Sequence, residues 1–264
     1  MLAWQLTKAS SKSSIDYTAE QRSCGVFCHG PLLRLVQTTP GIFNDSKEFV
    51  DMPMKVSPEL IHSSFKAAFP ELAADPLASQ PANHPAGNVS RERVVEFLGT
   101  YFGQPGGGLI SGGTPPDWMA QPSVATSQPN ATIRAFVLGA NDVWKVLYRE
   151  TNATLFPGKK PSSQSSLLPP ANPVIVPGER FREQYYWDTL WIVRGLIRSG
   201  MVATAQGMVE NLVAFVERYG FVPNGGRVYY LQRSQPPVLA LMVEMVASAI
   251  AGDTIAPEVG PTLR

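Results

Sequence analysis

The sequence predicts an all-α protein in which long loops join amphipathic helices. Apolar residues recur at steps of three and four over several stretches of the second half, the spacing that places them on one helix face. Residues that favour helix ends flank these stretches. The 24 prolines and 22 glycines indicate long connections between the helices.

Two helices are predicted in the first half of the chain. Ser57, followed by Pro58, supplies a cap and a first turn for a helix that reaches about Phe69. Ser90 caps a second helix that reaches about Phe102. In each case a hydroxyl oxygen can accept from a free N–H of the first turn.

Two longer helices carry clear apolar stripes. The helix expected over 131–151 has its stripe on Ile133, Phe136, Val137, Ala140, Trp144 and Leu147. The helix expected over 183–199 has its stripe on Trp187, Leu190, Trp191, Val193, Leu196 and Ile197. This spacing predicts that both helices pack their striped face on the core.

The last two predicted helices end at glycines. Residues 205–219 form a striped helix that Gly220 ends as a left-handed cap. A helix over 236–251 opens with two prolines and ends before Gly252. Because it is apolar on nearly all sides, we expect it to be buried between neighbours.

Two helices joined by a short Gly-Met turn, then a polar loop and a third helix, form the repeat of an (α/α)6 toroid. Such a barrel gathers its binding loops at one end of the inner helices. Only part of the ring fits in 264 residues, so we expect an incomplete (α/α)6 toroid with long loops. The Pro- and Ser-rich residues 157–173 are expected to form an extended linker across its surface.

Composition excludes several classes of protein. With 44% apolar and 16% charged residues, the chain is neither a polyelectrolyte nor largely disordered, and it can bury a substantial core. A net charge of +1 gives no basic surface for nucleic acid. No apolar run reaches the roughly 18 residues needed to cross a bilayer.

Residues 176–188, VPGERFREQYYWD, crowd arginines, acids, tyrosines and a tryptophan behind a Pro-Gly turn. A second loop, from Asn224 to the run Arg233, Ser234 and Gln235, is also rich in polar and aromatic groups. A pyranose presents hydroxyls around its rim and C–H groups on its faces. It therefore needs forked donors, bidentate acceptors and an aromatic platform. The two segments predict a sugar pocket.

The first of these segments resembles the trehalase signature Pro-Gly-Gly-Arg-Phe-x-Glu-x-Tyr-x-Trp-Asp-x-Tyr. It departs at Glu179, in place of the second glycine, and at Leu190, in place of the last tyrosine. PNG and RSQPP downstream, and CHGPLLRLVQ, NDSKEFVDMPMK and TPPDW upstream, follow the order of landmarks in animal-type trehalases. The resemblance implies a variable segment over 1–23 and a partial trehalase-like domain over 24–264.

The resemblance implies an α,α-trehalase, a glycoside hydrolase that converts trehalose to two glucose molecules with inversion and without cofactor or metal. The substrate-binding residues that it implies are Arg180, Trp187, Asp188, Asn224, Arg233, Ser234 and Gln235. The family's motif for the acid, Glu-Ser-Gly-Trp-Asp-Phe-Ser-Ser-Arg-Trp, does not occur here, nor does its Gln-Trp-Asp-x-Pro-x-Gly-Trp-Ala-Pro signature near the base. We therefore assign no catalytic residue and expect a fragment without acid and base.

Two other interpretations stay open. The chain can be a sugar-binding relic without catalysis, or a helical scaffold without a carbohydrate role. In the scaffold, Arg180, Glu183 and Asp188 would form an ion-pair network at a helix start. Pairing on a helix surface explains Arg182 and Glu183. The Gly-rich residues 106–113 lack the Gly-Lys-Ser/Thr ending of a phosphate loop, so we expect a flexible loop or lid.

Cys24 and Cys28 are the two cysteines. A structural zinc site needs four ligands, and no further Cys/His cluster accompanies them. A disulfide is possible, as in secreted relatives, and four Asn-x-Ser/Thr sequons suit a secreted protein. Residues 1–23, however, hold no apolar core of a signal peptide, so the compartment stays open.

Overall fold

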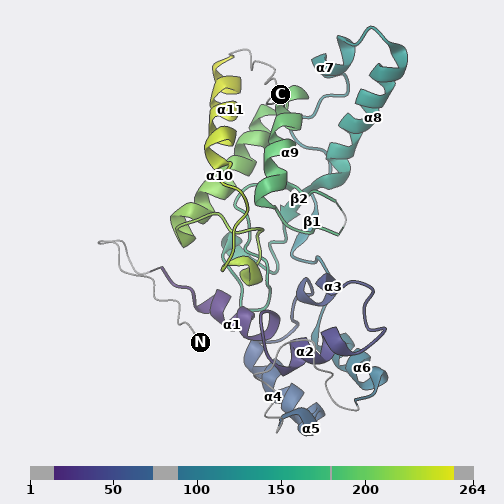
Figure 1. Cartoon of the computed structure of the whole chain (residues 1–264), viewed down its shortest axis with the longest axis vertical. Coiled ribbons are helices and arrows are strands. Elements are labelled where there is room, and N and C mark those ends of the chain that lie inside the picture. The colour runs from purple at the N-terminus through teal and green to yellow at the C-terminus, as the bar shows by residue number, and fades with distance from the viewer. Residues whose placement is uncertain (1–14, 74–88, 179, 253–264) are drawn as a thin grey trace, which may run out of the picture.

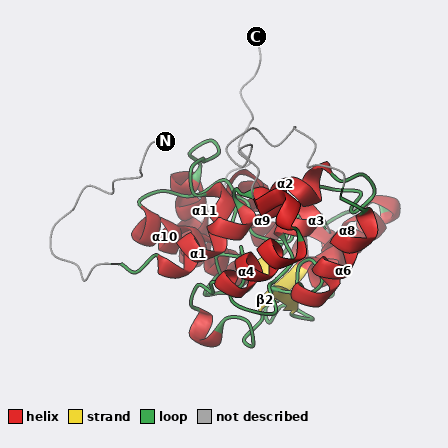
Figure 2. Ribbon diagram, turned by 90° about the horizontal axis from the view of Figure 1, so that it is seen from below, coloured by secondary structure: helices red, strands yellow, loops and turns green. Residues whose placement is uncertain are grey.

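A computed structural model describes residues 15–73, 89–178 and 180–252 of this chain. It is mostly helical, as predicted, with one small sheet (Figure 2). The helices are α1 (Thr18–Phe27), α2 (Pro31–Thr38), α3 (Lys47–Val50), α4 (Pro58–Ala68), α5 (Pro70–Ala73), α6 (Arg91–Tyr101), α7 (Ser123–Thr126), α8 (Ala131–Leu147), α9 (Tyr186–Arg198), α10 (Val202–Tyr219) and α11 (Leu239–Ala251). The remaining elements are the strands β1 (Leu109–Ser111), β2 (Tyr148–Thr151) and β3 (Val174–Ile175) and the short 3-10 turns η2 (Pro157–Lys159) and η3 (Val228–Tyr230).

The helices gather in two lobes (Figure 1). The N-terminal lobe holds α1 to α6, and its core includes Phe27 and Phe49, whose ring centroids are 5.8 Å apart. The second lobe holds α7 to α11, and α9, α10 and α11 pack on one another around Leu196, Met208 and Met242. Helix α1 also contacts η3, so the first lobe reaches the loop that follows α10.

Several helix ends lie where the sequence predicts them. The Ser57 hydroxyl accepts a first-turn N–H of α4 at 3.4 Å, and the Ser90 hydroxyl accepts one of α6 at 3.5 Å. Gly220 and Gly252 end α10 and α11 with φ of 82° and 77°, a left-handed conformation that glycine adopts without strain. These four predicted caps are confirmed.

The sheet corrects two predictions. The helix expected over 131–151 ends at Leu147, because the next four residues form β2, antiparallel to both β1 and β3. Tyr148 and Thr151 are of the aromatic and β-branched types that favour a strand. The Gly-rich stretch expected as a flexible loop or lid contributes β1, in which Leu109 pairs with Thr151. This part of the stretch is therefore fixed to the sheet.

Residues 165–168 show that the prediction of a surface linker is wrong there. Both serines and both leucines of this stretch are buried. The Ser166 hydroxyl donates to the Val50 carbonyl at 2.5 Å, and the Leu168 N–H donates to the Gly226 carbonyl at 2.9 Å. The segment can be buried because its polar groups find backbone partners. It connects the N-terminal lobe to the loop that follows α10.

Two helices, α8 and α11, expose apolar faces that were expected to be buried, and on α9 Trp187 and Trp191 of the predicted stripe are 39% and 51% exposed. On α8, Phe136 is 75% exposed, and the partly buried Trp144 and Leu147 pack on the core. On α11, Met242 and Val246 are buried. The exposed apolar side chains of α11 are Leu241, Val243 and Ile250. Neither helix, nor any other in the described ranges, is long and apolar enough to span a membrane.

The two cysteines form a disulfide at the C-terminal end of α1. This pairing uses both thiols, so neither is available as a zinc ligand. Among the described residues, no group of three or more His, Cys, Asp or Glu is placed to hold a metal ion.

Candidate functional site

The two segments predicted to bind sugar meet at the N-terminal end of α9. The Tyr186 N–H donates to the Asn224 carbonyl oxygen at 3.2 Å. The Trp187 N–H donates to the side-chain oxygen of Gln235 at 2.7 Å. Asp188 lies in the same helix turn, so its predicted proximity to the loop of Asn224 and Gln235 is confirmed.

The loop after α10 approaches the motif closely because Gly225 has no side chain. A β-carbon at Gly225 would lie 3.1 Å from ring atoms of both Tyr185 and Tyr230. The hydroxyl oxygens of these two tyrosines are 3.1 Å apart. Burial, and then the charge of Glu183, raise the pKa of the Tyr185 hydroxyl, which therefore stays protonated at neutral pH.

Four of the predicted residues have polar groups that form no hydrogen bond or ion pair with any described residue. They are the indole N–H of Trp187, the carboxylate of Asp188, the side-chain amide of Asn224 and the guanidinium of Arg233. Asp188 and Asn224 are both half-buried. The first turn of a helix favours a negative charge such as that of Asp188. These groups are available to a ligand.

The other three predicted residues are engaged within the fold. Arg180 forms an ion pair with Asp45, donating from Nη2 at 3.0 Å, and this bond lowers the pKa of Asp45. The Ser234 hydroxyl donates to the Val222 carbonyl at 2.7 Å. Gln235 accepts from α9 as described above. Their first role is to hold the two segments in place.

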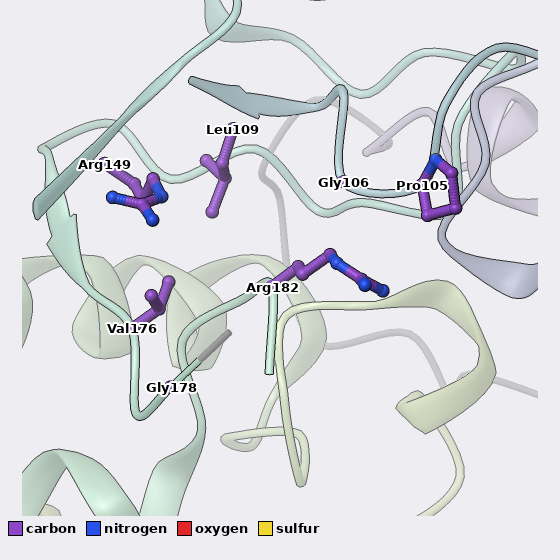
Figure 3. A pocket seen from close by; sticks show the side chains of 7 residues that line it. All are labelled: Pro105, Gly106, Leu109, Arg149, Val176, Gly178 and Arg182. Carbon is purple, nitrogen blue, oxygen red and sulfur yellow. The ribbon is translucent and has the colours of Figure 1, made fainter. Parts of the chain in front are cut away.

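Two of the predicted residues, both arginines, border different pockets. Arg180 borders a pocket of about 250 Å³, and Arg233 borders one of about 660 Å³ beside α1. Tyr229 lines both pockets, so the two arginines flank the same short turn. A third pocket, of about 210 Å³, lies between the Gly-rich stretch and the motif. Figure 3 shows Arg182 extended toward Gly106, where a β-carbon would lie 2.6 Å from Arg182 Cδ.

A buried ion pair is the feature that the sequence pattern missed. Glu183 is 0% exposed and precedes α9, so the predicted pairing on a helix surface is wrong. Its Oε2 accepts from Lys47 Nζ and from Arg227 Nε, each at 2.9 Å. Arg182 also turns inward, 3.4 Å from Asp51. Because Lys47 and Arg227 lie 136 and 44 residues away from Glu183, no local periodicity could reveal them.

Residues 41–264 match the family model of trehalase. The chain belongs to the trehalase family. It is 38% identical to the human trehalase over 219 residues, which cover 83% of this chain and 34% of that enzyme. It is 37% identical to the trehalase of Dictyostelium discoideum over 230 residues, 87% of this chain and 36% of the relative. With the trehalase of Tenebrio molitor it shares 35% identity over 252 residues, 94% of this chain and 42% of the relative.

The chain therefore spans between a third and about two fifths of the length of these trehalases. The resemblance drawn from the signature is confirmed as membership of the family. Leu190, where the trehalase signature has a tyrosine, is buried in the core of the second lobe. Glu179, the other departure, lies outside the described residues.

Proposed function

We propose that this chain supplies the glucose-binding part of an α,α-trehalase, which hydrolyses trehalose to two glucose molecules. The observation that carries the proposal is the set of unengaged polar groups on Asp188, Asn224 and Arg233. Asp188 and Asn224 are half-buried, and in a purely structural helix start polar groups at that depth usually have protein partners. Membership of the trehalase family supports the choice of sugar.

Each unengaged group has a definite use toward a pyranose. The Asp188 carboxylate can accept from two hydroxyls, and charge-assisted bonds of this kind are stronger than neutral ones. Arg233 lies over the ring of Tyr230, 4.9 Å from its centroid, and can donate to vicinal oxygens from its fork. The Asn224 amide both donates and accepts. Trp187 is 39% exposed and offers an apolar face to the C–H side of the sugar.

The engaged residues keep donors for a ligand. Arg180 binds Asp45 through Nε and Nη2, which leaves Nη1 for a sugar hydroxyl. Gln235 uses its oxygen on α9, which leaves its NH₂ group. Ser234 is exposed beside them. A wrong sugar would leave such groups unpaired, which gives the site its selectivity.

We place the chemical step outside these residues. Inverting hydrolysis needs an acid on one face of the sugar and a base that activates water on the other. Neither family motif for these carboxylates occurs in this sequence, and the related trehalases are longer than the matched region. Asp188 is therefore assigned to binding alone.

The same proposal accounts for the exposed apolar faces. Helices α9, α10 and α11 pack consecutively, which supports part of an (α/α)6 toroid. Further helices of such a ring would cover the exposed apolar side chains of α8 and α11. Covering these faces would remove apolar surface from water and stabilise the assembly.

Glucose release from trehalose tests the proposal. The 264-residue chain alone is expected to release no glucose above a heat-killed control, because acid and base are absent. The chain joined to the C-terminal part of human trehalase is expected to release glucose, and that C-terminal part alone is expected not to. Release by the chain alone that Asp188→Asn abolishes would show that the catalytic groups are misassigned.

An inactive sugar-binding relic is the second candidate. It is favoured by the same unengaged groups together with the absent acid and base motifs. It predicts that the chain alone, when folded, binds trehalose without turnover. A transcript that continues past Arg264 into the acid and base motifs would exclude it.

A further inference from the structure

A buried ionic cluster connects the N-terminal lobe to both sugar-binding segments. It consists of Lys47, Asp51, Glu183 and Arg227, which are 6%, 2%, 0% and 1% exposed. Lys47 Nζ lies 2.5 Å from Asp51 Oδ2 and 2.9 Å from Glu183 Oε2. Arg227 Nε lies 2.9 Å from Glu183 Oε2 and 3.5 Å from Asp51 Oδ1. Among these four residues each cation has an anion beside it, so none of the four charges is buried without an opposite charge. The partly exposed Arg182 adds a third cation, 3.4 Å from Asp51.

Arg227 is the centre of this cluster. Its Nη1 donates to the Ser166 hydroxyl at 3.0 Å, and its Nη2 donates to the Arg182 carbonyl at 2.9 Å. Burial alone would lower the pKa of Arg227, but Asp51 and Glu183 together raise it above its usual value. The side chain therefore keeps its charge, and its planar fork holds several chain segments at once. A lysine could not reproduce this fork.

The Glu183–Arg227 pair joins the two segments that carry the sugar-binding groups. Glu183 lies in the motif, five residues before Asp188, and Arg227 lies three residues after Asn224. Beside the pair, the Gly226 N–H donates to the carbonyl of the residue that follows Glu183, at 2.9 Å. The pair therefore adds an ionic connection to the hydrogen bonds that hold the segment of Asp188 beside that of Asn224.

The same cluster reaches the N-terminal lobe and the turn beneath Arg233. Lys47 and Asp51 belong to α3 and its end. Asp51 Oδ1 accepts from the Tyr229 hydroxyl at 3.0 Å. The next residue, Tyr230, carries the ring over which Arg233 lies. The position of α3 is thus transmitted to an arginine of the sugar site.

We propose that Glu183 and Arg227 are positioning residues for sugar binding, and that Lys47 and Asp51 make the N-terminal lobe part of the site. Removing one member leaves a buried charge without its partner. The two segments would then separate to admit water, and the unengaged groups would lose their present arrangement. The identity of the sugar rests on the proposed function, whereas the positioning of the two segments does not.

The test compares three variants with a matched control. Glu183→Gln removes one charge of the cluster. Arg227→Lys keeps the charge and loses the fork. The double variant Lys47→Met with Glu183→Gln removes one cation and one anion, so the four residues keep a net charge of zero. It does not restore the contacts that Glu183 makes with Lys47 and Arg227. The control Asp117→Asn weakens a partly buried contact that lies outside both segments, in which the Thr204 N–H at the start of α10 donates to Asp117 at 2.9 Å.

Three readouts separate positioning from stability. Amide hydrogen exchange over 184–190 and 221–235 reports whether the segments stay together. Isothermal titration with trehalose reports affinity, and thermal melting reports the stability of the fold. We expect faster exchange in both segments for the cluster variants but not for the control. Trehalose affinity is expected to fall by about ten- to a hundredfold, as for a misplaced site.

The charge-balanced double variant is decisive. We expect it to recover the melting temperature of the wild type while exchange in 221–235 stays fast. Arg227→Lys should likewise loosen this loop more than it lowers melting. If either variant melts lower while exchange in both segments matches the wild type, the cluster only stabilises the fold and the proposal is wrong. If the wild type binds no trehalose but exchange responds as expected, the positioning role stands and the proposed sugar function fails.

Discussion

The side-chain oxygen of Gln235 accepts a hydrogen bond of 2.7 Å from the backbone N–H of Trp187, although 48 residues separate them. This N–H belongs to the first turn of α9, where it has no partner within the helix. Tyr185, at the N-cap position, makes no side-chain capping bond. Gln235 therefore caps α9 from the second sugar-binding segment and ties that segment to the helix that carries Asp188.

Gln235→Ala is expected to destabilise the protein by about 1 kcal/mol, the usual effect of losing a helix cap. Gln235→Glu keeps an acceptor oxygen and places a negative charge at a helix N-terminus, so it should retain most of the stability. Chemical denaturation of the three proteins measures the difference. An unchanged free energy of unfolding in Gln235→Ala would show that the bond to Trp187 contributes nothing.

The exposed apolar faces predict self-association of the 264-residue chain. Phe136 of α8 is 75% exposed, and α11 exposes Leu241 and Ile250. Apolar surfaces of this kind favour association in water. Light scattering after size exclusion should show species larger than a monomer. A monodisperse monomer with a sharp cooperative melt would contradict the incomplete barrel.

A single substitution should locate this association. Phe136→Ser is expected to reduce the apparent mass at a given concentration. Leu60→Ser, on the separate helix α4, removes an apolar side chain that is 48% exposed and serves as the control. If both substitutions reduce the apparent mass equally, the overall polarity of the surface controls association, and the exposed face of α8 does not.

The buried tyrosines predict a loss of stability at high pH. Burial raises the pKa of Tyr185 and of Tyr229 above the usual value, and Glu183 adds to the effect on both. A folded-state pKa above the unfolded value means that the native state holds its proton more tightly. Stability from these groups is therefore complete below about pH 10, the unfolded pKa, and is lost as pH rises above it.

Denaturation between pH 8 and pH 11 checks this sign. The free energy of unfolding should be flat at first and then fall as the pH passes about 10. Tyr185→Phe, which has no phenolic proton to lose, should weaken the fall. If the free energy of unfolding falls with the same slope in wild type and in Tyr185→Phe, then Tyr185 does not cause the loss of stability.

The helix ends were predictable because they depend on neighbouring residues. Ser57 and Ser90 bond to N–H groups three residues ahead, and Gly220 and Gly252 need only their own φ angle. The apolar stripe of α8 could also be predicted from nearby residues, but the elements that pack against this helix could not. Periodicity identifies an apolar face and cannot show whether the chain supplies a partner for it, as the exposure of Phe136 demonstrates.

The sequence could predict which residue types form the site, but it could predict few of the contacts between them. The motif placed Asp188 near Asn224, because both belong to recognisable polar segments. The role of Gln235 as a cap, the burial of Glu183 and the burial of residues 165–168 depend on contacts between distant segments. Arg180 was expected on the sugar, and its ion pair with Asp45 joins residues 135 apart.

The catalytic efficiency of the joined enzyme on trehalose tests the central claim most directly. If Asp188, Asn224 and Arg233 hold glucose, each alanine substitution should lower kcat/KM, because a charged or polar group of the sugar site is left unpaired. The decrease should correspond to a loss of about 2 to 4 kcal/mol in transition-state stabilisation. We expect the same of Arg180, through its free Nη1. Arg198→Ala, exposed at the far end of α9, should leave kcat/KM unchanged. Near-normal hydrolysis by a normally folded Asp188→Ala enzyme would contradict the account and reduce the motif to scaffold.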